Sequence, residues 1–166
     1  MAVSTVMKVR RDGEIKLTTG GGSPVNFVVS YEDGNFSASG LAANEARTVI
    51  RDRGTIVGLR KGDTEVPTLS FSVHMAEFSN QGADTLLDIV NGTASGSALT
   101  SIGGSGYEQF LLRVTMTCEG TDHGDNADAV VIFENVLFTA DFSEGDPNVL
   151  NFQGEIYGSI SRSGQS

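Results

Sequence analysis

The 166-residue chain carries a formal charge of −10 and is 39% apolar, enough for one domain with a core and too much for wholesale disorder. Its 21 glycines favour strands and turns over helices. A single cysteine, Cys118, excludes an internal disulfide or a cysteine-rich zinc site. No apolar run has the roughly 18 residues of a membrane span, and the N-terminus lacks the apolar stretch of a secretory signal, so we expect no membrane association.

Charge is distributed unevenly along the sequence. Residues 1–61 hold nine Lys or Arg against six acids, a net +3, whereas residues 62–166 hold two against fifteen, a net −13. A net acidic protein is a poor binder of nucleic acid through phosphate neutralisation. The asymmetry either serves solubility or lets a basic region of one copy meet an acidic region of the next, head to tail.

The N-terminal part is predicted to form strands. Asp12-Gly13 between two alternating runs predicts a hairpin over Val6–Leu17. A glycine-rich loop follows at residues 18–24, but it lacks the lysine and the following helix of a phosphate-binding loop. Val25–Tyr31 then alternates apolar and polar residues, as a half-buried strand does.

The next elements are separated by turn residues. Residues 41–53 are expected to form a second long loop region, in which a connector over Leu41–Ala46 runs into a strand over Arg47–Arg53. A strand is predicted over Thr55–Arg60, ending in a turn at Lys61–Thr64. Pro67 suits the first residue of the following strand, Thr68–Phe78, because its missing N–H need not join the ladder.

One helix is predicted, over Ala83–Val90, with a cap at Asn80 or Asp84 and a stop at Gly92. A long loop of small residues follows at 93–106, and a loop of this length in a compact domain is usually functional or mobile.

A long strand is predicted over Tyr107–Glu119. Its alternation makes Cys118 a small core residue, and the same pattern over 68–78 makes His74 a surface histidine.

The C-terminal part is the most regular. Strands are predicted over Ala129–Phe133 and Val136–Phe142, followed by an acidic turn at Ser143–Asn148 and a return strand over Val149–Ile160. The return strand directs Leu150, Phe152, Ile156 and Ile160 to one face and polar residues to the other.

The loop over residues 120–128 is the one candidate metal site. Asp122, His123, Asp125 and Asp128 offer oxygen and nitrogen ligands, but their spacing is not that of an EF-hand. We expect a solvated acidic loop and no metal, with a calcium-binding β-sandwich as an alternative.

Motifs for catalysis are absent from the sequence. It contains no nucleophile elbow, no H-E-x-x-H, no Walker A and no G-x-G-x-x-G motif. Asp141 and Glu155, on facing strands, are the best acid–base pair, but no tryptophan offers a sugar platform beside them. We expect no enzyme, no catalytic residues and no cofactor.

Four long strands therefore carry one apolar and one hydrophilic face. This pattern predicts a mainly β fold, an antiparallel β-sandwich or barrel with one short flanking α-helix, in a single domain over residues 1–166.

The chain also resembles the major tail tube proteins of long-tailed (siphovirus-type) phages, which are related to the tube proteins of contractile tails and type VI secretion. The resemblance depends on Arg51-Asp52-Arg53-Gly54, on Gly62-Asp63 with Pro67 before a long strand, on one short helix, and on Glu144-Gly145-Asp146-Pro147-Asn148 before a final strand. It implies hexameric rings that stack into a tube, in the virion tail, after assembly in the host cytoplasm.

The resemblance also implies partners and surfaces. The partners are further copies of the chain, a tape measure protein, a tail terminator and distal tail or baseplate proteins, while viral DNA passes through without specific binding. A polar, acidic channel wall would not hold phosphates. The lumen-facing candidates are Ser70, Ser72, Thr115, Thr117, Thr139, Asp141, Asn151, Gln153 and Glu155, and the assembly-loop candidates are Arg47, Arg51, Arg53, Gly96 and Gly104. A type VI secretion-like tube protein is the alternative within the same class.

Overall fold

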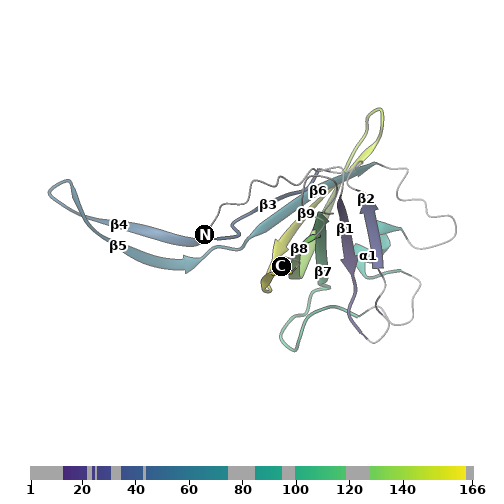
Figure 1. The fold of residues 1–166 in the computed structure, drawn as a ribbon, viewed down its shortest axis with the longest axis horizontal. Coiled ribbons are helices and arrows are strands. Elements are labelled where there is room, and N and C mark those ends of the chain that lie inside the picture. Colours follow the sequence, from purple (N-terminus) through teal and green to yellow (C-terminus); the bar gives the residue numbers. More distant parts are fainter. Residues whose placement is uncertain are drawn as a thin grey trace.

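The structure is a computed structural model that describes residues 13–21, 24, 26–30, 35–42, 44–74, 85–94, 100–118 and 128–163. The described chain is mainly antiparallel β-structure with one short helix, so the predicted fold class is confirmed (Figure 1). No helix within these ranges has the length and apolar character needed to cross a membrane. The elements are β1 (Gly13–Thr18), β2 (Asn26–Ser30), β3 (Ser37–Ser39), β4 (Glu45–Asp52), β5 (Thr55–Thr64), β6 (Thr68–His74), α1 (Leu86–Asn91), β7 (Leu112–Cys118), β8 (Ala129–Ser143), β9 (Val149–Ile156) and β10 (Ile160–Ser163).

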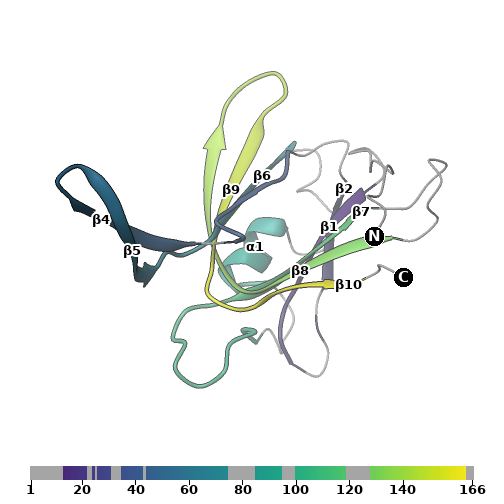
Figure 2. The ribbon, with the colours of Figure 1, turned by 60° about the vertical axis from the view of Figure 1, so that its left-hand side comes forward.

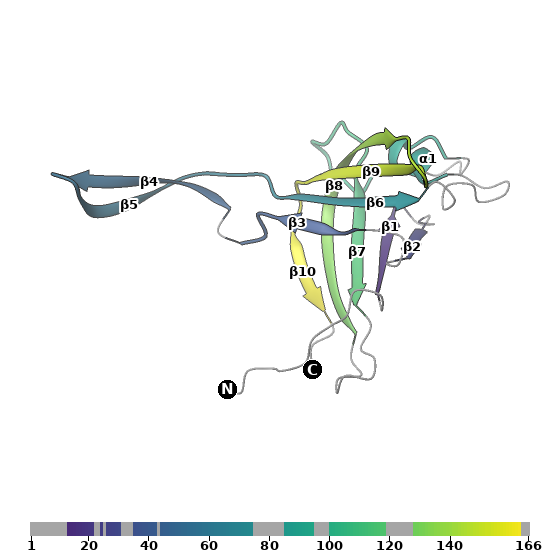
Figure 3. The same cartoon turned by 90° about the horizontal axis from the view of Figure 1, so that it is seen from above.

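Eight of these strands form one sheet, in the order β2-β1-β7-β8-β9-β6-β3, with β10 paired to β8. The sheet curls into a half-barrel, so that β6 and β9 cross over β1, β7 and the first half of β8 (Figures 2 and 3). The other two strands, β4 and β5, form a separate two-stranded sheet and project from the body as a long hairpin. We call this hairpin, residues 45–64, the arm.

Strand β8 belongs to both parts of the curl. Its first half pairs with β7 and β10, and its second half pairs with β9. Between the halves, Glu134 and Asn135 lie opposite the single residue Arg113, which makes a β-bulge. Asn135 has a φ of 54°, a left-handed conformation that asparagine tolerates better than most residues, and Arg113 Nε donates to Glu134 Oε1 at 2.8 Å. Glu134-Asn135 therefore bends one strand instead of separating two.

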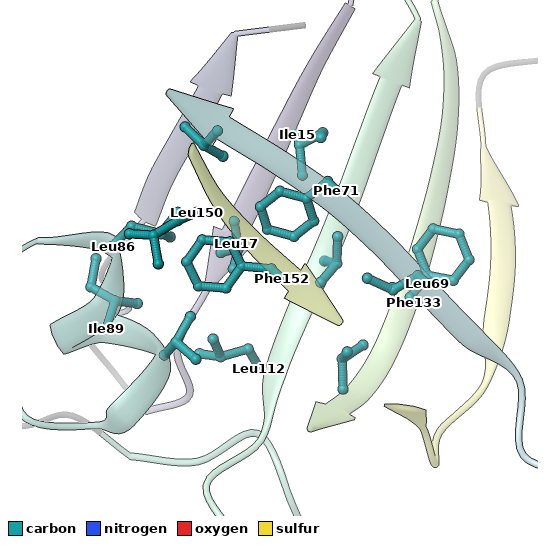
Figure 4. Close-up of a cluster of buried hydrophobic side chains, with 14 of the residues drawn as sticks. Ile15, Leu17, Leu69, Phe71, Leu86, Ile89, Leu112, Phe133, Leu150 and Phe152 are labelled. Atoms are coloured by element: carbon teal, nitrogen blue, oxygen red, sulfur yellow. The ribbon is translucent and has the colours of Figure 1, made fainter. Parts of the chain in front are cut away.

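The core fills the space inside the curl (Figure 4). Phe152 of β9 and Phe71 of β6 stack with ring centroids 5.1 Å apart, and both rings are buried. They face Leu17, Val114 and other apolar residues from the crossing strands. Complete burial of each such side chain stabilises the fold by about 1.5–3 kcal/mol. The fully buried residues are Ile15, Leu17, Leu69, Val73, Leu86, Leu111, Leu112, Val114, Phe133, Val136 and Phe152.

Helix α1 packs its apolar side, Leu86, Ile89 and Val90, on this core. It begins after Thr85, which forms a capping box with Asp88, so the predicted cap at Asn80 or Asp84 was wrong. The predicted stop is confirmed, because Gly92 ends the helix with a φ of 67°.

Two strand boundaries differ from the prediction. Strand β7 begins at Leu112, because the chain before it is bonded to the 100–103 loop, where Leu111 N donates to Ser101 Oγ at 2.8 Å. The return strand is interrupted after Ile156, and β10 then pairs with the first half of β8. Parts of several predictions lie outside the described residues: Val6–Asp12, Met75–Phe78, Gly96 and the loop over 119–127.

Candidate functional site

Strands β8, β9, β6 and β3 present one continuous hydrophilic surface on the side away from the core. Across it, Thr139 pairs with Gln153, Gln153 with Ser70, and Ser70 with Ser37. The neighbouring rows hold Asp141, Asn151 and Ser72 on one side, and Leu137, Glu155, Thr68 and Ser39 on the other. We call this surface the polar face. It exists because each of these strands alternates, so that the intervening residues point to the core side, where most of them are buried or partly buried.

The polar face is acidic and amply hydrogen-bonding. It carries the carboxylates Asp141 and Glu155, and its described residues include no lysine or arginine. Thr139 Oγ1 donates to the Gln153 carbonyl at 3.4 Å, and Asn151 Nδ2 donates to Ser143 Oγ at 3.1 Å. A hollow of about 360 Å³ over the centre is lined by five Ser and Thr residues together with Gln153, Glu155 and the apolar Leu137 and Leu69. Such a surface offers many hydrogen-bonding groups and an excess of negative charge.

Seven of the nine predicted lumen residues lie together on the polar face: Ser70, Ser72, Thr139, Asp141, Asn151, Gln153 and Glu155. The other two, Thr115 and Thr117, lie on the outward side of β7, beyond the core. There Thr115 pairs with Lys16 and Thr117 with Glu14 of β1. The structure thus separates the nine residues into two surfaces, and whether either borders a channel stays a prediction.

Glu155 has a specific partner at the edge of the polar face. Tyr157 Oη donates a very short hydrogen bond to Glu155 Oε2. This bond, with a smaller effect of desolvation, raises the pKa of the Tyr157 hydroxyl above its ordinary 10.0. The pair fixes both side chains where the sheet approaches the base of the arm.

The arm has one face with more apolar side chains than the other. Val49 pairs with Leu59, and Arg51 pairs with Ile56, so these four side chains lie on one face. Val57 lies between these two pairs, at a register shift in the ladder. Ile56, Val57 and Leu59 are each about 60% exposed, far more than a folded body leaves its large apolar residues. A two-stranded hairpin has no core of its own, so this apolar surface is available to a partner.

Positive charge is concentrated on the arm. It holds Arg47, Arg51, Arg53, Arg60 and Lys61, which are five of the eleven basic residues in the sequence. Lys61 is paired with Glu45, whereas the arginines form no ion pair with any residue that the structure describes. The charge asymmetry seen in the sequence therefore becomes a spatial one, with a basic arm on an acidic body.

The arm contains the strands that were predicted over residues 47–53 and 55–60, but both are longer at the base. Strand β4 begins at Glu45, and residues 61–64 continue β5 instead of forming the predicted turn. Gly62 misled the prediction: it lies at a register shift where a β-carbon would be 2.9 Å from the Ala46 carbonyl oxygen. The true turn is Arg53-Gly54, with both φ angles positive (45° and 88°), and an X-Gly pair between alternating runs was the signal that could have found it.

The five predicted assembly residues lie in different parts of the chain. Arg47 and Arg51 lie in β4 and Arg53 lies in the arm's turn, so they share one projecting element. Gly104 lies in an exposed loop near the body, with no atom within 4 Å of where its β-carbon would be. Gly96 lies outside the described residues.

The residues considered for chemistry do not form a site in the described ranges. No group of three His, Cys, Asp or Glu among these residues could hold a metal ion, and the loop with Asp122, His123 and Asp125 is not described. Cys118 is half-buried at the end of β7. His74 ends β6 half-buried, and its Nδ1 atom is enclosed without a hydrogen-bond partner among the described residues.

Comparison with known proteins shows what this fold resembles. No protein-family model and no curated protein matches the sequence. Among solved structures, a chain of the anti-feeding prophage cap, described as a tube-terminating cap, aligns over 99% of this chain and 95% of its own, with 13% identity and a TM-score of 0.54. A chain of the sheath–tube complex of an extracellular contractile injection system in its extended state aligns over 98% and 95%, with 15% identity and a TM-score of 0.52. The chain therefore shares the fold of components of contractile injection systems.

Proposed function

We propose that this protein is a non-enzymatic structural subunit of a tail-like tube, in which copies form rings, six-membered in the tube proteins it resembles, and the rings stack around a channel. The observation that carries the proposal is the polar face: four adjacent strands expose hydroxyls, amides and two carboxylates, with no cation among their described residues. The fold that it shares with a tube-terminating cap and with a sheath–tube complex supports the same role.

The polar face suits the wall of a channel for a polyanion. A phosphate backbone binds where lysine and arginine release its counterions, and this surface offers none of either. Hydroxyl and amide groups stay hydrated, so DNA passes over a layer of water. In this proposal the tube belongs to a virion tail of the long-tailed phage type and conducts viral DNA, with a tape measure protein, a tail terminator and baseplate proteins as its other partners.

Assembly would also remove the unpaired strand edges. Among the described strands, β2 and β3 end the main sheet, and each has a neighbour on one side only. Pairing with the next copy in a ring would satisfy these backbone groups, which otherwise invite aggregation. Contacts between stacked rings would be heterologous and would not close, so they build a filament.

Electron microscopy of the purified protein, with nuclease protection of DNA, tests this proposal. We expect rings or tubes at high protein concentration, and tubes assembled with DNA should not keep nuclease-resistant DNA. Gln153→Lys with Ser70→Lys should assemble but retain protected DNA. Thr115→Lys with Thr117→Lys, on the other surface, is the matched control, because DNA bound outside the tube stays open to the nuclease. Monomers at every concentration would refute the tube, and protected DNA in the control alone would refute the placement of the lumen.

A second role in the same assembly comes from the likeness to a tube-terminating cap. A cap subunit would form a single ring on a tube made by another protein. Micrographs of the purified chain separate the two roles, because a tube subunit gives stacks of many rings and a cap gives isolated rings. A secretion-type tube, carrying protein cargo instead of DNA, would form the same stacks, and the genes beside its own would separate it from a phage tail tube.

A further inference from the structure

The base of the arm contains an apolar hollow that the described chain leaves unfilled. Its volume is about 450 Å³, and it is lined chiefly by Leu41, Val66, Pro67, Ile156, Tyr157 and Ile160. Leu41, Val66 and Tyr157 remain 44–48% exposed. We call this hollow the socket.

The socket is built on fixed backbone. Asn44 and Glu65 close the base of the arm, with Glu65 N donating to the Asn44 carbonyl at 2.6 Å and Asn44 Nδ2 donating to the Glu65 carbonyl at 2.9 Å. Ile156 N donates to the Pro67 carbonyl at 2.9 Å, which ties the arm's root to β9. The hollow therefore has a preformed shape, as binding sites for apolar groups usually do.

The arm's own tip cannot fill the socket. The ladder between β4 and β5 runs from Glu45 and Thr64 to Asp52 and Thr55, and the ten residues of β5 hold the tip about 30 Å from the base. The figures show the arm pointing away from the body (Figures 1 and 3). The tip and the socket are thus both apolar and exposed, and they could bury each other. Within one copy they lie too far apart to do so.

We propose that the tip of the arm, with Ile56, Val57 and Leu59, inserts into the socket of a second copy of this chain. This inference rests on the proposed function and names the contact that links neighbouring copies. Tip and socket are different surfaces, so the contact is heterologous and continues from copy to copy in a ring or along a filament.

Charge favours this partner. The tip carries Arg51 and Arg53, and Arg51 Nη1 donates a 3.5 Å hydrogen bond to the Gly54 carbonyl oxygen. The rim of the socket carries Glu65, and Tyr157 in its wall holds Glu155. The basic residue at the arm's root, Lys61, is already paired with Glu45. Opposite charges around an apolar centre direct association and select the partner.

A competing acceptor is the tip of the β8–β9 hairpin. It is acidic, with Asp141, Glu144 and Asp146, and Phe142 is 56% exposed there. It presents a projecting ring instead of a hollow, so it lacks the concave shape that the arm's branched side chains require. Docking of the arm on this hairpin is therefore the alternative that the following experiment must exclude.

A photo-crosslinking residue at Val57 in the full chain tests the inference directly. In assembled protein we expect crosslinked dimers whose adducts, mapped by mass spectrometry, lie in residues 39–44, 64–67 or 156–160. The same probe at Leu87, an exposed leucine on α1, should give no adducts in those peptides. Adducts from Val57 on the β8–β9 hairpin, or elsewhere on the body, would overturn the docking.

Charged substitutions give an independent readout. Val57→Asp at the tip and Val66→Asp in the socket should each raise the protein concentration needed for assembly at least tenfold, while Leu87→Asp, on the exposed side of α1, should change it less than twofold. An equal effect of Leu87→Asp, or assembly unchanged by the other two, would overturn the inference. If the wild type forms tubes and these tests fail, only the docking is wrong; if the wild type never assembles, the proposed function fails as well.

Discussion

The amide of Gly158 donates a 3.0 Å hydrogen bond to the carbonyl oxygen of Glu134, and a β-carbon on Gly158 would lie 2.5 Å from that same oxygen. Tyr157 N donates in the same way to the Asn135 carbonyl at 3.0 Å. These two bonds hold the chain beside the bulge of β8, where it leaves β9 and enters β10. Only glycine can come this close to the bulge.

Gly158→Ala should therefore destabilise the domain by about 1–3 kcal/mol, because the methyl group forces the two chains apart. Chemical unfolding of the purified protein measures the change. Gly104→Ala is the control, since its β-carbon would have no atom within 4 Å, and it should alter stability by less than about 0.5 kcal/mol. Equal stability of the two variants would contradict the close approach at Gly158.

Phe152→Ala should cost about 3–5 kcal/mol, because it removes a ring that is buried between the two parts of the curl and stacked on Phe71. Phe142 belongs to the same sheet but is 56% exposed, so Phe142→Ala should cost far less. Thermal unfolding of both variants makes the comparison. A similar loss from each would mean that the core does not lie where β6 and β9 cross the other strands.

The cap of α1 predicts a stability change and its dependence on pH. Thr85→Ala should cost about 1 kcal/mol, whereas Thr85→Ser keeps the hydroxyl and should cost less. Hydrogen bonds from the Thr85 side chain, and then from its amide, hold the pKa of Asp88 below its ordinary 3.8. The ionised carboxylate therefore stabilises the folded state above pH 3.8, and this contribution is lost as the pH falls through the lowered pKa.

The variant Asp88→Asn tests the direction of this pH dependence of stability. The difference in unfolding free energy between wild type and variant should be constant near neutral pH and shrink on acidification below 3.8. A difference that grows on acidification would contradict the hydrogen-bonded cap.

Tyr157 should ionise above the ordinary tyrosine pKa of 10.0. The Glu155 carboxylate accepts a hydrogen bond from the Tyr157 hydroxyl, and this bond raises the pKa of Tyr157. Because the folded-state pKa lies above 10.0, this bond stabilises the fold below pH 10.0 and ceases to do so as the pH rises through the raised value. Absorbance titration follows the phenolates.

Tyr157→Phe should remove the latest phase of that titration, and Glu155→Gln should shift the phase to lower pH. An unchanged latest phase in Tyr157→Phe would contradict the raised pKa of Tyr157 and its bond to Glu155.

The sequence was most informative where strands alternate. The pattern over Val149–Ile156 correctly placed Leu150, Phe152 and Ile156 in the core, and the pattern over 68–74 did the same for Leu69, Phe71 and Val73. Seven polar residues on the opposite sides of these strands and of β8 could therefore be assigned to one surface. Alternation is a local property of the sequence, so it can be recognised without knowing which strands lie beside each other.

Which strands are neighbours in the sheet could not be predicted from the sequence pattern in the same way. Thr115 alternates like Ser70, but β7 lies on the other side of the core, and only the register of β8 with both neighbours shows this. The two strands of the arm were predicted, but their projection as a separate hairpin was missed, because its apolar residues find no core in a single copy and the usual link between apolar character and burial fails there. Gly62 and Asp63 then look like a turn although they continue β5.

The fifteen residues of β8 have a consequence for how the domain comes apart. Each half of the strand is hydrogen-bonded into a different part of the curl, so pulling either part loose removes a wall from the other. If one part of the curl opened alone, β8 would lose hydrogen bonds on one half, and the other part would lose the support of that strand. The domain should hence lose its structure in one cooperative step, with amide protons on both parts of the curl exchanging at a common slow rate set by global unfolding, while those of the arm exchange independently and sooner.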